Sequence, residues 1–346
     1  MASTINDVAR LAGVSKSTVS KVLNNRSSIS PATVERVKQA IKELNYTPNS
    51  RAVSFARRST KNIIYLTNLA KNSAYQNPHM FDIMCGVHKA LSKKNFALSL
   101  VDTSEEAYPG ERAHNEITRG GADGIIIHGS SVNEQLAQEI SSTGFPHIVI
   151  GCPEYSDNLC WIDINHVLEG EYAAAHMVEC NYKDVVFICG KEKNGICAQR
   201  LKGFRKKMLN SGIHIPKDNI WYTNPNQQNA YEITRNNLKT HRNENGLKCP
   251  QAVICENSAM ASSIMRALFE AGLSIPEDIA FLGFDQYPYT SLVYPVPTVI
   301  NIDVFDLGVQ AGEMMIRKLE NPNLLIQSYT TLPCLMQGAS TVVAKS

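Results

Sequence analysis

The sequence has few of the features that mark a membrane, secreted or catalytic protein. It contains no run of about 18 consecutive apolar residues, which predicts that no segment spans a membrane. Its first residues include no apolar core typical of a secretory signal, so we expect a cytoplasmic protein. It has no G-x-S-x-G, Walker or G-x-G-x-x-G motif and no metal-ligand cluster in sequence. The sequence therefore predicts neither an enzyme nor a bound cofactor or metal.

Cysteine is present, but not in a pattern that marks a metal or redox site. None of the nine cysteines forms a C-x-x-C pair, and several lie in apolar, strand-like runs, such as Cys189 in VVFICG and Cys255 in AVICEN. This placement favours buried, reduced thiols over a zinc site or a nucleophilic cysteine, which are the alternatives.

The charge is small overall but unevenly distributed. The net charge of the 346 residues is +2, yet residues 1–60 carry ten Lys and Arg against three Asp and Glu, a net charge of +7. The remainder carries 24 basic and 29 acidic residues, a net charge of −5. A chain of this length predicts two or three domains, and its basic N-terminal part predicts a polyanionic partner for that part alone.

The first 47 residues have the signals of three short helices. Thr4 with Asp7 predicts a capping box, Gly13 predicts the end of the first helix, and Ser15 predicts the start of the second. Ser30-Pro31 predicts the start of a third helix that ends near Asn45. The first two form a helix-turn-helix pattern, although a three-helix bundle with no DNA-binding role would show similar signals. The positions expected to face inward are Ile5, Val8, Ala9, Ala12, Val19, Val22, Leu23, Val34, Val37, Ile41 and Leu44.

These N-terminal residues, called the head from here on, are also similar to a known family. The stretches TINDVARLAGVSKSTVSKVLN and SPATVERVKQAIKELNYTPNSRA resemble the DNA-binding domain of the lactose-repressor (LacI/GalR) family. The resemblance implies that Lys16, Ser17 and Lys21 read base edges in the major groove. The other head residues expected at the DNA, mostly at phosphates, are Thr4, Ser15, Thr18, Ser20, Asn24, Asn25, Arg26 and Ser30.

Residues 48–61 resemble the hinge helix and linker of the same family. Asn49 and Arg51 are expected at the DNA, and Phe55 stands where the family has a leucine that wedges into the minor groove. Packing of Phe55 against the body is the alternative. The family's usual arginine two residues before the wedge is Val53 here, so the side chain that makes one contact in the family is missing. A segment of under three turns is unstable alone in water, so the resemblance implies that it folds on DNA.

Residues 62–346 alternate strand-like apolar runs with amphipathic helical stretches, which predicts parallel α/β sheets. This body resembles the two-lobed, type I periplasmic-binding-protein-like core of the family. The resemblance predicts an N lobe of about residues 62–162 and 291–322 and a C lobe of about residues 163–288 and 325–340. The crossings between the lobes are expected near 162–165, 286–292 and 322–327. Ligands of such folds bind at the carboxyl ends of the strands, between the lobes.

Six positions of the body match effector-contacting positions of the family or lie near them. Arg200 in QRLKGF suits a bidentate contact to effector oxygens, and Asp285 in GFDQ suits hydroxyl or N–H donors. The two side chains could instead pair with each other or cap helices, and a histidine at a strand end often has no ligand. The six expected effector residues are His79, Met80, His128, Arg200, Asn257 and Asp285.

The resemblance implies an effector-responsive regulator, a repressor of carbohydrate-utilisation genes, that binds near-palindromic operator DNA as a homodimer. A sugar or sugar derivative is the expected effector, although Asn165-His166 replaces the family's usual Asp-Asn and the family's late arginine is missing. A solute-binding protein for a small molecule is the alternative, and the basic head counts against it. The sequence does not show whether the effector releases or recruits the regulator.

Overall fold

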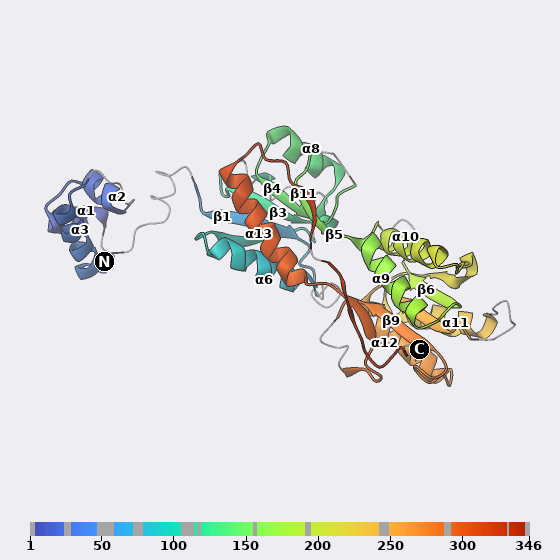
Figure 1. The fold of residues 1–346 in the computed structure, drawn as a ribbon. Coiled ribbons are helices and arrows are strands. Elements are labelled where there is room, and N and C mark those ends of the chain that lie inside the picture. Colours follow the sequence, from blue (N-terminus) through green and yellow to red (C-terminus); the bar gives the residue numbers. More distant parts are fainter. Residues whose placement is uncertain are drawn as a thin grey trace.

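The computed structural model describes residues 4–23, 29–46, 59–71, 79–104, 114–115, 118, 120–154, 158–190, 195–241, 249–286, 292–330 and 332–342. Figure 1 shows a small helical head and two α/β lobes. No helix in these segments is long and apolar enough to cross a membrane.

The head consists of α1 (Ile5–Ala12), α2 (Lys16–Leu23) and α3 (Pro31–Glu43). The helix signals in the sequence are confirmed. Thr4 and Asp7 form the capping box, and Gly13 ends α1 with φ 61°, a left-handed conformation that glycine adopts without strain. Ser30 accepts a hydrogen bond from the Thr33 N–H, and Pro31 follows it as the first helical residue. Val8, Val19 and Val37 are completely buried at the centre, where the three helices meet.

The N lobe is a six-stranded parallel sheet in the order β11-β5-β4-β3-β1-β2. Its helices α6 (His79–Ser92) and α13 (Val304–Glu320) cover one face, and α8 (Glu134–Thr143) covers the other (Figure 1). The strands are β1 (Asn62–Thr67), β2 (Ala97–Asp102), β3 (Gly124–His128), β4 (His147–Ile150), β5 (Trp161–Ile164) and β11 (Gln327–Thr330); η1 (Gly129–Ser131) follows β3.

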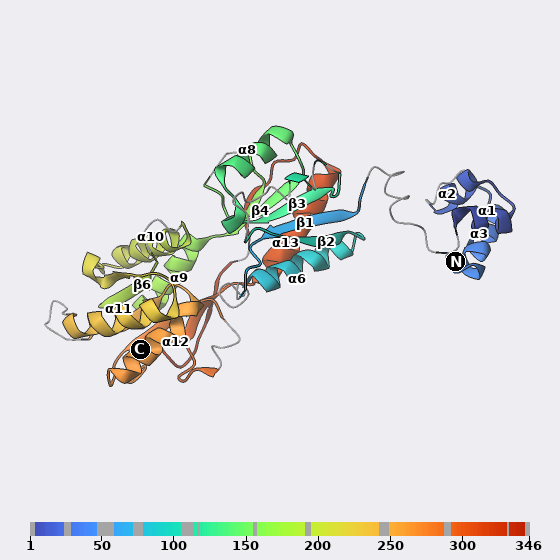
Figure 2. The ribbon, with the colours of Figure 1, turned by 180° about the vertical axis from the view of Figure 1, so that it is seen from behind.

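The C lobe has the same order, β12-β10-β9-β8-β6-β7, with β12 antiparallel to β10. Helices α9 (His166–Glu179) and α10 (Gly195–Asn210) cover one face, and α11 (Gln227–Thr240) and α12 (Ser258–Glu270) cover the other (Figure 2). The strands are β6 (Val185–Cys189), β7 (Ile220–Tyr222), β8 (Ala252–Cys255), β9 (Ala280–Phe284), β10 (Thr298–Asn301) and β12 (Cys334–Met336); η2 (Lys217–Asn219) precedes β7.

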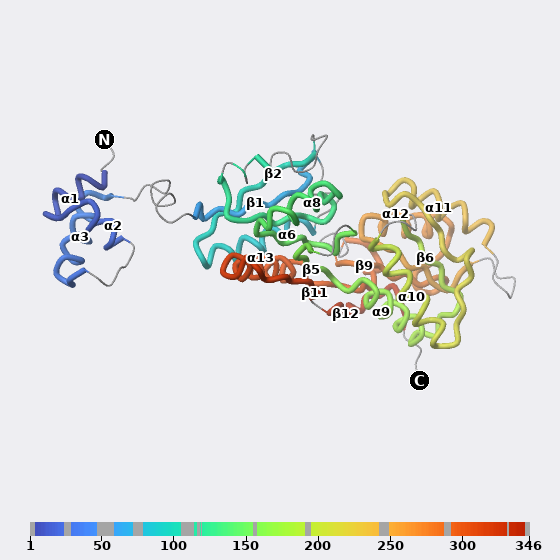
Figure 3. The backbone as a smooth tube through the Cα atoms, turned by 90° about the horizontal axis from the view of Figure 1, so that it is seen from above, coloured from blue at the N-terminus to red at the C-terminus, as the bar shows by residue number. Residues whose placement is uncertain are grey.

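Two of the three crossings between the lobes come later in the chain than predicted. The first lies between β5 and α9, at residues 164–166. The second lies between β10 and α13, at residues 301–304 rather than 286–292, because β10 pairs with β9 in the C-lobe sheet. The third lies between β11 and β12, at residues 330–334 rather than 322–327, because β11 pairs with β5 in the N-lobe sheet. Figure 3 shows β5, β11 and β12 where the two lobes adjoin.

Helices α9 and α10 approach each other closely because both carry glycine at their contact. A Cβ atom on Gly170 would lie 1.9 Å from the Arg200 main-chain oxygen. A Cβ atom on Gly203 would lie 1.9 Å from the Val167 main-chain oxygen. Only hydrogen fits at these two positions, so the spacing between α9 and α10, and with it the position of Arg200, depends on them.

The predicted burial of the cysteines is confirmed for five residues and wrong for two. Cys160, Cys180, Cys189, Cys197 and Cys255 are buried, whereas Cys152 and Cys334 are exposed. All nine are free thiols. Of the two tryptophans, Trp221 lies in the C-lobe core and Trp161 packs edge-on against Tyr329, with ring centroids 5.2 Å apart.

Candidate functional site

The helix α2 exposes polar side chains opposite its buried face. Lys16, Ser17 and Lys21 are exposed, whereas Val19 and Val22 are buried against the other two helices. The side chains expected to read bases are therefore free of the head's core. A helix that is held by its apolar face and exposes lysine and serine can enter a major groove.

Several residues predicted at phosphates also hold the head together. The Ser15 hydroxyl accepts a hydrogen bond from the Thr18 N–H at 3.1 Å and so begins α2. Thr4 and Ser30 cap α1 and α3. All three cap residues are exposed, while Thr18 and Ser20 are half-buried. Six other predicted DNA-contacting residues, Asn24, Asn25, Arg26, Asn49, Arg51 and Phe55, lie outside the described residues.

Arg200 is the centre of a buried polar network in the C lobe. Its Nε and Nη2 atoms donate to the two carboxylate oxygens of Glu169, at 2.9 and 3.0 Å. Its Nη2 also lies 3.3 Å from Oδ1 of Asp285, and its Nη1 donates to the Glu256 main-chain oxygen at 2.6 Å. The guanidinium carbon lies 4.4 Å from the centre of the Phe284 ring. Arg200 is 3% exposed, so these contacts fix it in one position.

Asp285 follows β9 with φ 69°, a left-handed conformation that aspartate adopts more readily than most residues. It is buried, and burial alone would raise the pKa of its carboxyl group. Arg200 and then His79 act in the opposite direction, and the pKa falls to about 2. Asp285 is therefore a charged acceptor at neutral pH, placed at the carboxyl end of its strand.

His166 extends this network to the other lobe at the first crossing. Its Nδ1 lies 2.6 Å from the Glu169 carboxylate, and its Nε2 lies 3.5 Å from the carboxylate of Asp163 in β5. Burial alone would lower the pKa of His166, but hydrogen bonds to Asp163 and then Glu169 outweigh it, and the pKa rises to about 9. Asp163 also accepts from the Cys152 N–H at 2.9 Å. The network therefore begins in the N lobe and continues through α9 into α10.

His79 reaches the same network from the N lobe. It is the first residue of α6, and its Nε2 lies 3.6 Å from Oδ2 of Asp285. Because Asp163 and His79 both belong to the N lobe, the polar contacts join the two lobes at two places. The structure thus brings together three of the six predicted effector residues: His79, Arg200 and Asp285.

The other three predicted effector residues have local partners. Met80 is 5% exposed, and its sulfur accepts a hydrogen bond from the Thr67 hydroxyl at 3.1 Å, so it belongs to the N-lobe interior. The side-chain oxygen of Asn257 accepts from the Met260 N–H as the cap of α12. His128 pairs with the Ser130 hydroxyl at 2.8 Å, and burial lowers its pKa. None of the three joins the Arg200 contacts.

Sequence reasoning missed Glu169 and Asp163, which complete the network. Glu169 is completely buried, although its position inside an amphipathic helix resembles that of a surface residue. The sequence does contain a signal for both residues. His166 lies three residues before Glu169 on the same helical face, and an aspartate near the end of the preceding strand comes before the helix. In the sequence, His166 stands out only as a departure from the family pattern.

Comparisons with known proteins agree with this architecture. Residues 4–49 match the profile described as bacterial regulatory proteins, lacI family, and residues 174–341 match that of a periplasmic binding protein-like domain. The ribose operon repressor of Escherichia coli is 30% identical over 339 residues, which cover 97% of this chain and 99% of that protein.

Solved structures show the same fold. The lac repressor dimer bound to operator and the anti-inducer ONPF superposes with a TM-score of 0.79, at 23% identity, over 99% of this chain and 100% of that one. A LacI family transcriptional regulator from Enterococcus faecium with bound ribose gives a TM-score of 0.67, at 23% identity, over 82% of this chain and 100% of that one. The ribose operon repressor matches this chain over nearly the whole length of both proteins. The chain therefore belongs to the lacI family of bacterial regulatory proteins, and it is a DNA-binding transcriptional regulator.

Proposed function

We propose that this regulator is a homodimeric repressor whose operator binding is changed by a neutral sugar bound between the lobes. The observation that carries the proposal is the position of Arg200 and Asp285 beside His79, at the place where both lobes contribute to one polar network. A ligand that binds there contacts both lobes, so its binding energy depends on their relative position. A tenfold change in operator affinity requires about 1.4 kcal/mol of such coupling.

The charges of the network favour a neutral ligand. Arg200 and His166 are cationic at neutral pH, and they face the carboxylates of Asp163, Glu169 and Asp285. Both cations are already paired with these carboxylates, so a further anion such as a sugar phosphate would be repelled by the three acidic side chains. Ionised carboxylates only accept hydrogen bonds, whereas sugar hydroxyls donate them. The ribose operon repressor is named for a sugar of this kind, and the Enterococcus faecium regulator was solved with bound ribose.

The test combines ligand binding with operator binding by the full-length protein. Thermal shifts are measured with neutral pentoses and disaccharides, with sugar phosphates and with purines. A ligand at 100 times its Kd stabilises the native state by about 2.7 kcal/mol. The operator is first identified by selection from random DNA, and its affinity is then measured by anisotropy with and without each ligand.

The proposal predicts that a neutral sugar raises the melting temperature and changes operator affinity at least tenfold. Stabilisation by sugar phosphates or purines alone would show that the effector class is wrong. A sugar that stabilises the protein without changing operator affinity would overturn the proposed coupling between the sugar and the operator. The direction of the change decides whether the sugar is an inducer or a corepressor.

The contacts with DNA are proposed from the resemblance and the exposed face of α2. A two-fold dimer places two such helices about one helical turn apart, which matches a near-palindromic operator. Binding is expected to weaken with salt, with a slope of about −0.9 per phosphate contacted. Replacement of Phe55 by alanine is expected to weaken operator binding more than non-specific binding, since a wedge acts at one base step.

A further inference from the structure

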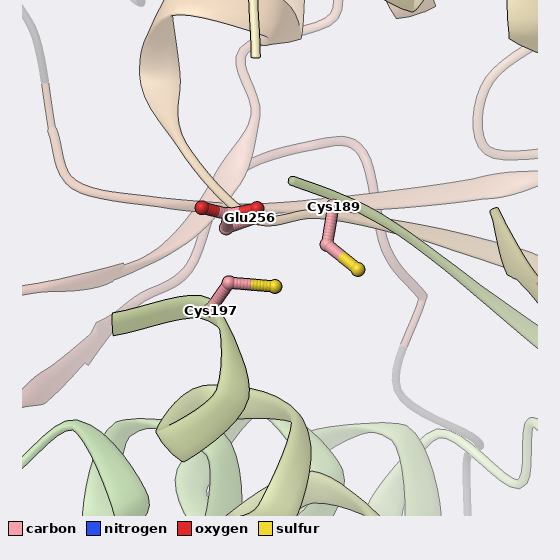
Figure 4. A group of neighbouring side chains, drawn as sticks. All are labelled: Cys189, Cys197 and Glu256. Atoms are coloured by element: carbon pink, nitrogen blue, oxygen red, sulfur yellow. The ribbon is translucent and has the colours of Figure 1, made fainter. Parts of the chain in front are cut away.

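A second group of buried side chains lies beside the effector network and is not part of it. Cys189 is the last residue of β6, Cys197 lies in the first turn of α10, and Glu256 follows β8 directly. Their exposed fractions are 0%, 0% and 3%. The two sulfur atoms and a carboxylate oxygen all lie within 4.8 Å of one another. Figure 4 shows the three side chains converging from three separate elements of the C lobe.

The strands place these side chains on one face of the sheet. Val185, Phe187 and Cys189 face α9 and α10, while Val186 and Ile188 face α11 and α12. Along β8 the alternation directs Cys255 to the α12 side, and the next residue, Glu256, to the side of Cys189. The sides on which Cys189 and Glu256 lie therefore follow from the alternation along β6 and β8, and the first turn of α10 places Cys197.

The carboxylate of Glu256 has a hydrogen bond, and among the described residues no ion pair to it is found. It accepts from the Gly190 N–H, and within the described part of the chain it forms no ion pair with a Lys, Arg or His side chain. Arg200 contacts the main-chain oxygen of Glu256 instead. A buried carboxylate is strongly disfavoured unless a positive charge compensates it. The cluster thus combines one carboxylate with two thiols, groups that bind transition-metal cations.

The chemistry of the ligands selects the cation. Two sulfurs and one carboxylate suit Zn²⁺, whereas Mg²⁺ and Ca²⁺ prefer oxygen ligands alone. With Zn–S bonds of about 2.3 Å, two sulfurs of a tetrahedral site lie about 3.8 Å apart. Ligand atoms already within 4.8 Å need only small shifts to reach this spacing. A disulfide would require a sulfur–sulfur distance of about 2.05 Å, a much larger approach.

We propose that Cys189, Cys197 and Glu256 form a binding site for one Zn²⁺ ion per chain. Binding converts both thiols to thiolates and releases their two protons to the solvent, so that the loaded site carries one net negative charge. The Cys197 thiol donates to the Gly190 main-chain oxygen at 3.4 Å and gives up this proton when it binds the metal, and a water molecule completes the four ligands.

A metal bound at this site would hold α10 in place, the helix that supplies the proposed effector-binding residue Arg200. Cys197 and Arg200 are three residues apart, within one turn of α10. A metal that ties this turn to the ends of β6 and β8 restricts the movement of Arg200. Zinc is therefore expected to raise the stability of the C lobe, whatever the effector is. This outcome is independent of the proposed function.

The test uses the full-length protein, prepared with a chelator and a reductant and then titrated with Zn²⁺. The amount of bound metal is measured by inductively coupled plasma mass spectrometry, and the affinity by isothermal titration calorimetry. The thiolate ligands are identified from the charge-transfer absorption of the Co²⁺-substituted protein. The variants are Cys189→Ser, Cys197→Ser and Glu256→Gln. The matched control is Cys255→Ser, since Cys255 is equally buried in the neighbouring strand and donates to the Asn257 main-chain oxygen, which serine can also do.

The proposal predicts one Zn²⁺ per chain in the wild type and in Cys255→Ser. It predicts a loss of affinity of at least about 100-fold in Cys189→Ser and Cys197→Ser, because even partners of metal ligands contribute 10- to 100-fold. Failure of the reduced wild type to bind Zn²⁺, or equal binding by the variants and the control, would overturn it. A protein mass lower by two hydrogen atoms, with a Cys189–Cys197 disulfide in place of the metal, would also overturn the proposal. If the cysteine variants do not fold, the Co²⁺ spectrum of the wild type decides: absent thiolate absorption rejects the site.

Discussion

His79 and Asp285 belong to different lobes, and the Nε2 atom of His79 lies 3.6 Å from Oδ2 of Asp285. His79 begins α6 of the N lobe, and Asp285 follows β9 of the C lobe. Arg200 holds the same carboxylate from within the C lobe. Asp285 is thus shared between the two lobes, and a change in the position of one lobe alters its electrostatic environment. In the proposed function, a sugar that contacts Asp285 is therefore sensitive to the relative position of the lobes.

Replacement of Asp285 by asparagine keeps the shape of the side chain and removes its charge. Because Arg200 retains Glu169, we expect the free energy of unfolding to fall by only about 1–3 kcal/mol. Sugar binding should weaken at least tenfold, while operator binding without ligand is retained. Denaturant unfolding, calorimetry and anisotropy measure the three quantities. The matched control is Asp82→Asn, on the exposed surface of α6. Equal effects of both variants on sugar binding would exclude Asp285 as an effector contact.

The network predicts a loss of stability at alkaline pH. The pKa of His166 is raised from 6.5 to about 9 in the folded protein. Protonation of His166 therefore stabilises the fold fully below pH about 6.5, and this contribution is lost as the pH rises through about 9. The shift corresponds to at most about 3 kcal/mol. Denaturant unfolding across this range should show the decline in the wild type.

Variants at histidine identify the group responsible. In His166→Asn the decline between pH about 6.5 and 9 should disappear, because the titrating group is gone. In His214→Asn it should persist, since His214 is exposed on the loop after α10. A decline of the same size in His166→Asn would assign it to another group and contradict the role of His166.

Local signals in the sequence predicted the head well. The capping box of Thr4 and Asp7, the glycine turn at Gly13 and the Ser30-Pro31 start all depend on residues within one helical turn. The crossings between the lobes were predicted less well. Whether β10 and β11 belong to one sheet or the other depends on their strand partners, which lie far away in the sequence. No local pattern distinguishes the two choices.

The candidate site was predicted only in part for the same reason. Arg200 and Asp285 were found because the resemblance extends to their motifs. Glu169 was not found, because its burial arises from the contact between α9 and α10, which depends on Gly170 and Gly203. The cluster of Cys189, Cys197 and Glu256 has no spacing motif at all, since three separate elements supply its members.

The close contact of α9 and α10 predicts that Gly170 does not tolerate a side chain. In Gly170→Ala the new methyl group would lie 1.9 Å from the Arg200 main-chain oxygen, so the helices must separate. We expect the free energy of unfolding to fall by about 1–3 kcal/mol, and sugar affinity to fall because Arg200 is displaced. The control is Gly195→Ala, whose methyl group would meet only the Glu154 side chain, at 3.7 Å. Equal stability of the two variants would show that the helices adjust without strain.

The exposed face of α2 predicts which lysines determine DNA sequence preference. Replacement of Lys16 by alanine should reduce discrimination between operator and random DNA by about 1–3 kcal/mol, because a base contact is lost. The control is Lys239→Ala, which removes one positive charge from an exposed position of α11 in the C lobe. Anisotropy with operator and random duplexes at the same salt concentration measures both affinities. If Lys16→Ala weakened both equally, Lys16 would contact a phosphate, and Ser17 and Lys21 would remain as the candidates for base recognition.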